Sequence, residues 1–151
     1  MVEKDRPLIR FHYQTKPFFF PNRSNLKDFI LKLFKTEGFE VGAINFIFCL
    51  DDYLLEINKA YLNHDTYTDI ITFQYSSTGE PILSDIYISI DRVQENARVF
   101  NVPFLHELNR VIIHGALHLC GYKDKSKTDI KRMRHKEDLY LSKYVSRENG
   151  G

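Results

Sequence analysis

Apolar residues recur along the chain at two spacings that predict strands and helices in alternation. Residues 9–13 alternate between apolar and polar side chains, which is typical of a half-buried strand. Residues 43–50 are nearly all apolar and predict a strand buried on both faces. Between them, Ser24 offers an N-cap and Gly38 a stop for a helix with an apolar stripe of Leu26, Phe29, Ile30, Leu33 and Phe34.

The middle of the chain repeats this order with a second helix and two further strands. Asp51 and Asp52 favour a helix start, and Leu54, Leu55, Ile57 and Tyr61 follow at helical spacing before a predicted loop over residues 63–68. Residues 70–75 and 82–90 are rich in β-forming side chains and flank a turn-like segment, residues 76–81. We therefore expect an antiparallel hairpin here.

Three helices are predicted in the last third of the chain. Asp91 favours the start of the first helix, which runs through Val99. Pro103 favours the start of the second, longer helix, and Gly121 ends it. A last helix covers about residues 128–144, and residues 145–151 are expected to fray. The pattern predicts an α+β fold: one domain over residues 1–151, with a mixed sheet of about four strands and helices packed on it.

Composition agrees with a single globular domain and places few limits on its partners. The chain has 151 residues, 43% of them apolar, which is enough for one buried core. No run approaches the roughly 20 apolar residues of a membrane span, so we expect a cytoplasmic protein without a membrane partner. Cys49 and Cys120 lie in apolar surroundings and are expected to be reduced thiols. The net charge of +1 is uninformative, but residues 123–136 are strongly basic.

A metal site is predicted at the end of the long helix that begins near Pro103. Two histidines lie in its last turns, and an aspartate follows it. His114 and His118 are four residues apart, so both imidazoles project from one helical face. Gly121 can adopt the left-handed conformation that ends a helix and turns the chain back, which would bring Asp124 to the same place. The three residues are therefore predicted to bind one metal ion.

Three protein ligands leave one coordination position open, which is typical of a catalytic zinc ion. With Asp124 as the third ligand, the formal charge of the centre is +1, against +2 for three imidazoles. The alternative is that His114 and His118 are ordinary core or surface histidines and Asp124 a solvated loop acid. The other histidines are scattered, although His135 could approach the site.

Several segments resemble one known family. The segment HGALHLCGYKD, residues 114–124, is similar to the signature of the YbeY family, in which three histidines bind zinc. Residues 58–73 (NKAYLNHDTYTDIITF) and 84–89 (SDIYIS) resemble two further family segments, and Met133 with Glu137 matches a pair in its last helix. The resemblance covers about residues 44–141.

The resemblance implies a cytoplasmic, zinc-dependent endoribonuclease, specific for single strands. Members mature ribosomal RNA, notably the 3′ end of the small-subunit RNA, and act in ribosome quality control. Two positions differ from the family pattern: Asp124 replaces the third histidine, and Leu62 replaces an arginine implicated in RNA cleavage or phosphate binding. Lys59 or a basic residue near Lys123 would then have to contact phosphate.

Two other functions remain open at this point. A zinc protease shares the ligand spacing, but Gly115 stands where such enzymes carry their glutamate base. A zinc-stabilised module that binds the small ribosomal subunit without cleaving RNA is the non-enzymatic alternative. Asp65, Asp69, Asp85 and Glu137 are expected to have structural roles near the metal. The sequence leaves the oligomeric state undetermined.

Overall fold

The computed structural model describes residues 6–62 and 68–149. All of the predicted loop over residues 63–68 except Thr68 lies outside them, including His64 and Asp65. Within the described residues there are four strands: β1 (Leu8–Tyr13), β2 (Val41–Cys49), β3 (Ile70–Gln74) and β4 (Ile82–Ser89). The helices of the same part of the chain are α1 (Arg23–Glu37), α2 (Asp51–Leu62), α3 (Ile90–Phe100), α4 (Phe104–Leu119) and α5 (Lys127–Asn149).

The strands form one mixed sheet in the order β1-β2-β4-β3. β1 and β2 pair in parallel, as do β2 and β4, whereas β3 pairs antiparallel to β4. The predicted hairpin is therefore present, and it supplies the antiparallel pair. Its turn contains Gly79 with φ +88°, a conformation that residues with a side chain rarely adopt. The predicted α+β fold with a mixed sheet is confirmed.

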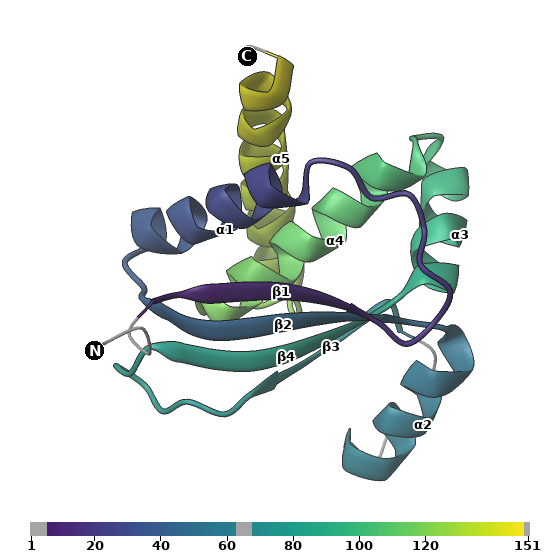
Figure 1. Cartoon of the computed structure of the whole chain (residues 1–151), viewed down its shortest axis with the longest axis horizontal. Helices are drawn as coiled ribbons and strands as arrows, with labels where there is room; N and C mark the ends of the chain where they lie inside the picture. The colour runs from purple at the N-terminus through teal and green to yellow at the C-terminus, as the bar shows by residue number, and fades with distance from the viewer. Residues whose placement is uncertain (1–5, 63–67, 150–151) are drawn as a thin grey trace.

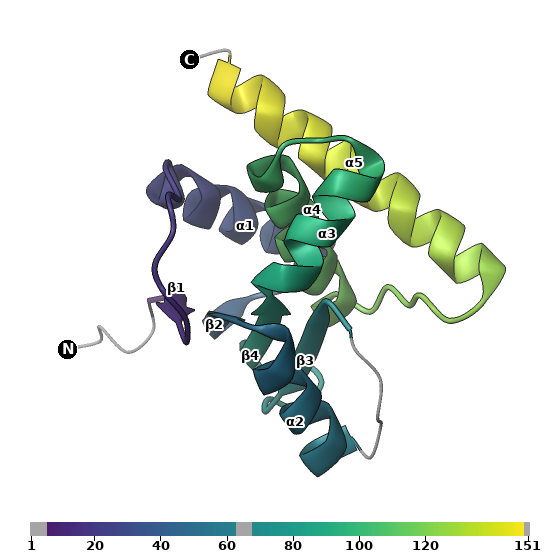
Figure 2. The same cartoon turned by 90° about the vertical axis from the view of Figure 1, so that its right-hand side faces the viewer.

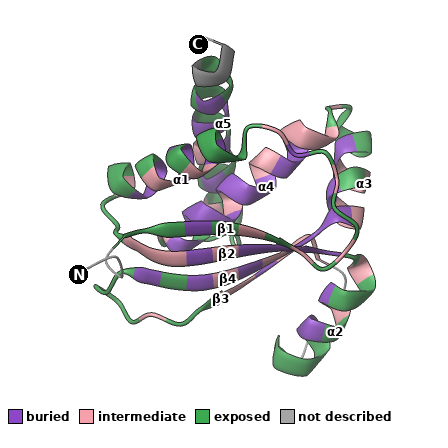
Figure 3. Ribbon diagram, in the orientation of Figure 1, coloured by how far each residue is buried: buried purple, intermediate pink, exposed green. Residues whose placement is uncertain are grey.

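Most of the helices cover one face of the sheet (Figure 1). α4 lies across this face, with α1 and α3 beside it and α5 along its outer side (Figure 2). The residues of the main core come from the sheet and from these helices, and Figure 3 shows their buried positions along the ribbon. α2 lies on the other face, where a smaller apolar cluster joins Leu54 and Ile57 to Cys49 and Ile71.

A close approach of α4 to the sheet occurs at Gly115. A Cβ atom at this position would lie 3.0 Å from Cδ1 of Ile70 and 3.3 Å from Cδ1 of Ile86. Because no side chain separates the helix from the strands here, α4 can rest directly on β3 and β4. This contact fixes the position of the neighbouring residue, His114.

Two predicted helix starts are wrong. α1 begins at Arg23 after Asn22, whose backbone is left-handed, rather than at Ser24. At the start of α3, the hydroxyl of Ser89 accepts a hydrogen bond from the backbone N–H of Arg92 at 3.2 Å, so Ser89 and not Asp91 is the N-cap. Asp91 is used elsewhere, because its carboxylate accepts the backbone N–H of Asp51 at the start of α2.

The last helix is longer than predicted. α5 continues as far as Asn149, so most of the tail that we expected to fray is helical, and residues 150–151 lie outside the described part. Among the helices of residues 6–62 and 68–149, none is both long enough and apolar enough to cross a membrane.

Candidate functional site

The end of α4 has the geometry that the sequence predicts. Gly121 has φ +99°, its N–H donates to the carbonyl of His118 at 3.0 Å, and the N–H of Tyr122 donates to the carbonyl of Leu117 at 3.2 Å. This pair of bonds is the Schellman motif, which satisfies the last carbonyls of a helix and reverses the chain. The chain after Gly121 consequently returns toward the side of α4 that carries His114.

The reversal brings Asp124 to His114. Oδ2 of Asp124 lies 3.4 Å from Nε2 of His114. Two ligands of one tetrahedral zinc ion, each about 2.0–2.1 Å from the metal, are about 3.4 Å apart. The spacing of these two atoms therefore fits a shared metal ion.

The third predicted ligand, His118, is not joined to the other two. Its side chain is exposed on the next turn of α4, and no hydrogen bond or ion pair links it to His114 or Asp124 in residues 6–62 and 68–149. In the same residues, no group of three or more His, Cys, Asp or Glu side chains is arranged to hold a metal ion. The full set of three ligands stays a prediction.

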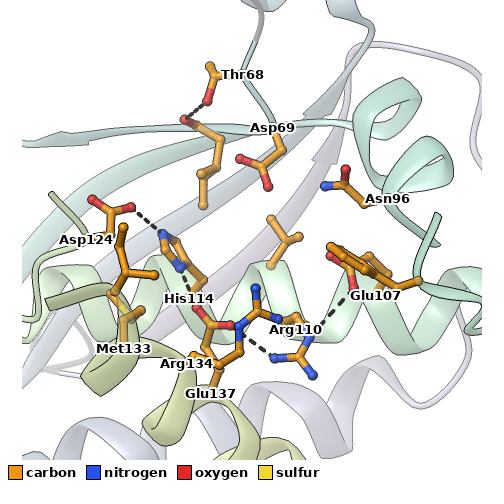
Figure 4. A pocket seen from close by; sticks show the side chains of 14 residues that line it. Thr68, Asp69, Asn96, Glu107, Arg110, His114, Asp124, Met133, Arg134 and Glu137 are labelled. Atoms are coloured by element: carbon orange, nitrogen blue, oxygen red, sulfur yellow. Dashed lines mark hydrogen bonds and ion pairs between the residues drawn. The ribbon is translucent and has the colours of Figure 1, made fainter. Parts of the chain in front are cut away.

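The other ring nitrogen of His114 is held by Glu137, a buried residue of α5. Nδ1 of His114 lies 2.6 Å from Oε2 of Glu137, and the second carboxylate oxygen accepts a hydrogen bond from Arg110 at 3.1 Å. His114 thus lies between Glu137 on one side and Asp124 on the other (Figure 4). An ionised carboxylate only accepts hydrogen bonds, so we assign the ring proton to Nδ1.

This arrangement fits the chemistry of a metal-binding histidine. Histidines that bind metals typically donate the other ring N–H to a carboxylate, which fixes the tautomer and orients the ring. With the proton on Nδ1, the lone pair of Nε2 faces Asp124. The donor set of one imidazole nitrogen and one carboxylate oxygen is suited to zinc, and His118 is one helical turn away.

A pocket of about 370 Å³ opens beside His114, between α3, α4, α5 and the start of β3. Its lining includes four carboxylates against two guanidinium groups; these are Asp69, Glu107, Asp124, Glu137, Arg110 and Arg134. Figure 4 shows these side chains around the cavity. The excess of negative charge at one place favours a bound cation.

The pKa shifts at the site have the same origin. Burial raises the pKa of Asp69, and the charges of Glu137 and Asp124 raise it further against the effect of His114. Burial also raises the pKa of Glu107, although Arg110 opposes the shift. Burial alone would lower the pKa of His114, because it disfavours the protonated form. The hydrogen bond to Glu137 and the negative charges of Glu137, Asp69 and Asp124 outweigh burial, so the pKa of His114 is raised. The surrounding carboxylates therefore favour a positive charge at this place, which is supplied either by a second proton on the imidazole or by a cation bound at Nε2.

Two residues of the pocket, Glu107 and Arg110, were not recognised from the sequence. Glu107 is buried, and Arg110 contacts Glu107 at 3.7 Å, Glu137 at 3.1 Å and Asp138 at 3.0 Å. A signal is present in the sequence, because residues 107, 110, 114 and 118 are polar at helical spacing in a helix that is mostly apolar after residue 110. Such a polar stripe indicates a site on that face.

The four acidic residues that we expected to be structural have different environments. Asp69 and Glu137 line the pocket, whereas Asp85 lies on the open face of the sheet, where Asn45 and Tyr75 donate hydrogen bonds to it at 3.1 and 3.0 Å. Asp65 lies outside the described residues. His135 is exposed on α5 and does not line the pocket.

The basic segment, residues 123–136, divides between two sides of α5. Arg132 lies over the ring of Tyr122, at 5.4 Å from its centroid, and Lys136 forms an ion pair with Glu37 at 3.4 Å. Arg134 is on the other side and is the basic residue of this segment that lines the pocket beside His114.

Comparisons with known proteins point to one family. A family model described as Endoribonuclease YbeY matches residues 15–145. A curated relative of the same name from Flavobacterium psychrophilum is 50% identical over 142 residues, which are 94% of this chain and 100% of the relative. A relative of that name from Phocaeicola vulgatus is 44% identical and covers 86% of this chain and 95% of its own length. A solution structure of a Thermotoga maritima protein aligns with TM-score 0.66 and 30% identity, over 94% of this chain and 92% of that one.

Proposed function

The chain belongs to the Endoribonuclease YbeY family, and from this premise we propose that it is a zinc-dependent endoribonuclease that cleaves single-stranded RNA during ribosomal RNA maturation. Its substrate is the 3′ end of the small-subunit RNA. The protein acts in the cytoplasm, where it associates with the small ribosomal subunit and takes part in ribosome quality control. The observation that carries the proposal is the position of His114, with Nε2 3.4 Å from Asp124 and Nδ1 bonded to Glu137.

The proposed zinc ligands are His114, His118 and Asp124. Two of them are already at the spacing of ligands on one ion, and the side chain of His118, one turn further along α4, is exposed and free of hydrogen bonds to the rest of the described chain. When bound, zinc supplies a Lewis acid for a phosphate oxygen and lowers the pKa of water toward neutrality.

The chain's own residues hold this centre in place. Glu137 keeps the proton of His114 on Nδ1 and the lone pair of Nε2 directed at Asp124. Arg110 in turn fixes Glu137, because its guanidinium bridges Glu137 and Asp138 between α4 and α5. His114, His118 and Glu137 are therefore held by two packed helices, which fix side chains better than a loop does, whereas Asp124 lies on the segment between them.

Substitution of Asp124 tests the proposal. We expect Asp124→Ala and Asp124→Asn to lose most of the bound zinc and to reduce cleavage of a single-stranded RNA by at least about a hundredfold, because a ligand is removed. Asp28→Asn is the matched control: it removes one negative charge from an exposed position of α1 outside the pocket. Metal content and RNA cleavage are measured on the same samples, purified without chelator.

The outcomes separate the proposed function from its alternatives. Unchanged zinc content and cleavage in both Asp124 variants would remove Asp124 from the site. A wild-type protein that carries zinc and binds small ribosomal subunits but cleaves no RNA would instead be a binding module. Cleavage of unfolded protein would indicate a protease, although Gly115 stands where such enzymes carry their glutamate base and lies in close contact with Ile70 and Ile86 of the sheet.

A further inference from the structure

The pocket beside His114 is lined by apolar side chains as well as by charged ones. Phe100 at the end of α3 and Ile130 on α5 are half-exposed there, at 51% and 50%. Exposed rings and aliphatic side chains next to a charged pocket offer surface for the sugars and bases of a single strand. The lining of the same pocket also includes Asp124 and Asp69. A single strand in this pocket would thus meet both apolar and acidic side chains.

A strand bound here needs a cation for its phosphates, and Arg110 does not provide one. Its side chain is 17% exposed, and its guanidinium already contacts Glu107, Glu137 and Asp138 at 3.0–3.7 Å. Nε of Arg110 faces Glu107, and Nη1 faces both Glu137 and Asp138, so three carboxylates already neutralise this one guanidinium. Arg110 is therefore committed to joining α4 and α5.

Arg134 is the other guanidinium of the pocket, and it has no such commitment. No carboxylate lies within ion-pair distance of Arg134 in residues 6–62 and 68–149. Its guanidinium lies over the ring of Phe100, with the central carbon 5.9 Å from the ring centroid. Stacking on a ring orients a guanidinium while its N–H groups stay available, and these groups match the oxygens of a phosphate.

From this contrast we propose that Arg134 binds a backbone phosphate of the RNA next to the scissile position, and that Phe100 is a positioning residue that holds the Arg134 guanidinium over the pocket. The inference rests on the proposed function in that its ligand is a single-stranded RNA at the same site. It assigns to α5 the phosphate contact that Leu62 on α2 cannot make. Arg134 acts in binding, and the bond-breaking chemistry stays with the residues around His114.

The salt dependence of RNA binding tests the phosphate contact directly. Binding of a fluorescent single-stranded oligoribonucleotide to the full chain is measured by anisotropy at several salt concentrations, with chelator present so that no RNA is cut. We expect Arg134→Ala to weaken binding about tenfold and to reduce the slope of log K against log salt by about 0.7, the value for one phosphate contact on a single strand. Arg134→Lys should keep the slope and lose part of the affinity, because it keeps the charge but not the planar group.

The control is Arg98→Ala, which removes the same charge from α3, close in sequence to Phe100. Arg98 is exposed, is paired with Glu95 and does not line the pocket. We expect its effect on RNA affinity to be less than about twofold. An equal loss in Arg98→Ala and Arg134→Ala, or a loss in Arg134→Ala without a change of slope, would overturn the proposal.

Phe100 is tested by a ring-removing and a ring-keeping substitution. Phe100→Leu should weaken RNA binding severalfold, whereas Phe100→Tyr should leave it unchanged. The double variant Phe100→Leu/Arg134→Ala should bind RNA as well as Arg134→Ala alone, because the ring acts through the guanidinium. Additive losses would remove Phe100 from this role. Thermal unfolding of each variant checks that the fold is retained, which the half-exposed position of Phe100 favours.

Cleavage kinetics with zinc present distinguish this inference from the proposed function. We expect Arg134→Ala to retain zinc and to raise KM about tenfold with kcat within about twofold of the wild type, because the lost contact serves binding. If the wild-type chain cuts no RNA, the proposed function fails, whereas the anisotropy result still decides the role of Arg134. If kcat falls and KM does not, Arg134 is not a binding residue and the inference is wrong.

Discussion

Nδ1 of His114 and Oε2 of Glu137 are 2.6 Å apart, although the two residues are separated by 23 positions in the sequence. The contact exists because α5 packs along α4 and buries Glu137 against it. A buried carboxylate bonded to an imidazole fixes which nitrogen carries the proton, and it also strengthens the other nitrogen as a metal ligand. Glu137 is therefore expected to control metal binding without touching the metal.

Glu137→Gln tests this role. The amide is similar in size but carries no charge, so we expect the affinity for zinc to fall about ten- to hundredfold while the protein remains folded. Competition with a chromophoric chelator measures the affinity. Glu107→Gln is the matched control, because Glu107 is also buried in the pocket and contacts Arg110 but has no hydrogen bond to His114. Equal losses in the two variants would show that pocket charge, and not the bond to the imidazole, sets the affinity.

The packing of α4 on the sheet gives a second prediction. A Cβ at Gly115 would already lie 3.0 Å from Cδ1 of Ile70, so we expect Gly115→Leu to displace the side chains of Ile70 and Ile86 and to push α4 away from the sheet. Overpacking of this kind costs about 1–3 kcal/mol, which lowers Tm by roughly 3–10 °C in a chain of this size. Because His114 is the next residue, we also expect weaker zinc binding.

Asn109→Leu is the control for this prediction, since it adds the same side chain at a half-exposed position of the same helix. Thermal unfolding followed by circular dichroism measures both variants. A Tm for Gly115→Leu within about 2 °C of the Asn109→Leu value would mean that the sheet accommodates the larger residue and that the close approach does not fix α4.

The sequence predicts the strands and helices well because each follows from local apolar spacing. It fails at helix starts where two capping residues compete. Ser89 and Asp91 can both cap α3, and the choice depends on Asp91 accepting the backbone N–H of Asp51 at the start of α2, 40 residues away. No local pattern contains that contact.

The same distinction applies to the site. The turn at Gly121 and the return of Asp124 to His114 are local events within eleven residues, and both are present. The links from Arg110 to Glu137 and from Arg134 to Phe100 join different helices, so they depend on how α5 packs against α4 and α3. The family resemblance includes Glu137 as a matching residue but does not say what this residue does. The packing of α5 against α4 shows its role, because it brings Glu137 to Nδ1 of His114.

The two cysteines are expected to be unreactive in the folded protein. Cys49 is fully buried and donates to the carbonyl of Ile88 at 3.5 Å, and burial with nearby Asp51 and Asp91 raises its pKa to about 12. Burial, with a smaller effect of Glu37, raises the pKa of Cys120 to about 12 as well. Since the thiolate is the reactive form, only about one thiol in 10⁴ is reactive at pH 8.

Thiol titration with a chromogenic disulfide checks this. At pH 8 we expect almost no reaction of the native protein within minutes and two thiols per chain after denaturation. The single variants Cys49→Ser and Cys120→Ser assign any reaction that occurs. Cys120 is only partly buried, whereas Cys49 is fully buried. Rapid modification of Cys49 would therefore contradict its burial, and rapid modification of Cys120 would contradict its raised pKa.

The last prediction concerns Glu37, which ties α1 to α5 and to the turn after α4. Its carboxylate accepts hydrogen bonds from Tyr140, from Tyr122 at 2.9 Å and from Lys136 at 3.4 Å. Burial alone would raise the pKa of Glu37, but the hydrogen bonds from Tyr140 and Tyr122 and the charge of Lys136 outweigh it and lower the pKa below 4.5. The folded state therefore prefers the ionised form.

A lowered folded-state pKa sets the sign of the pH dependence. The stability that Glu37 contributes is fully present above its unfolded-state pKa of about 4.5, and it is lost as the pH falls through the folded-state value. Glu37→Gln should thus reduce the free energy of unfolding by about 2 kcal/mol near pH 7, the usual worth of hydrogen bonds to a charged group. The difference from the wild type should shrink in acid, because the wild-type carboxyl is then protonated too.

Urea unfolding at pH 7 and at about pH 3.5 measures both differences. Glu40→Gln, at an exposed position three residues further along, is the control and should change the stability by less than about 0.5 kcal/mol at either pH. A loss in Glu37→Gln that is the same at the two pH values would mean that the shape of the side chain, and not its charge, holds the helices together. A loss that grows in acid would be inconsistent with a lowered pKa.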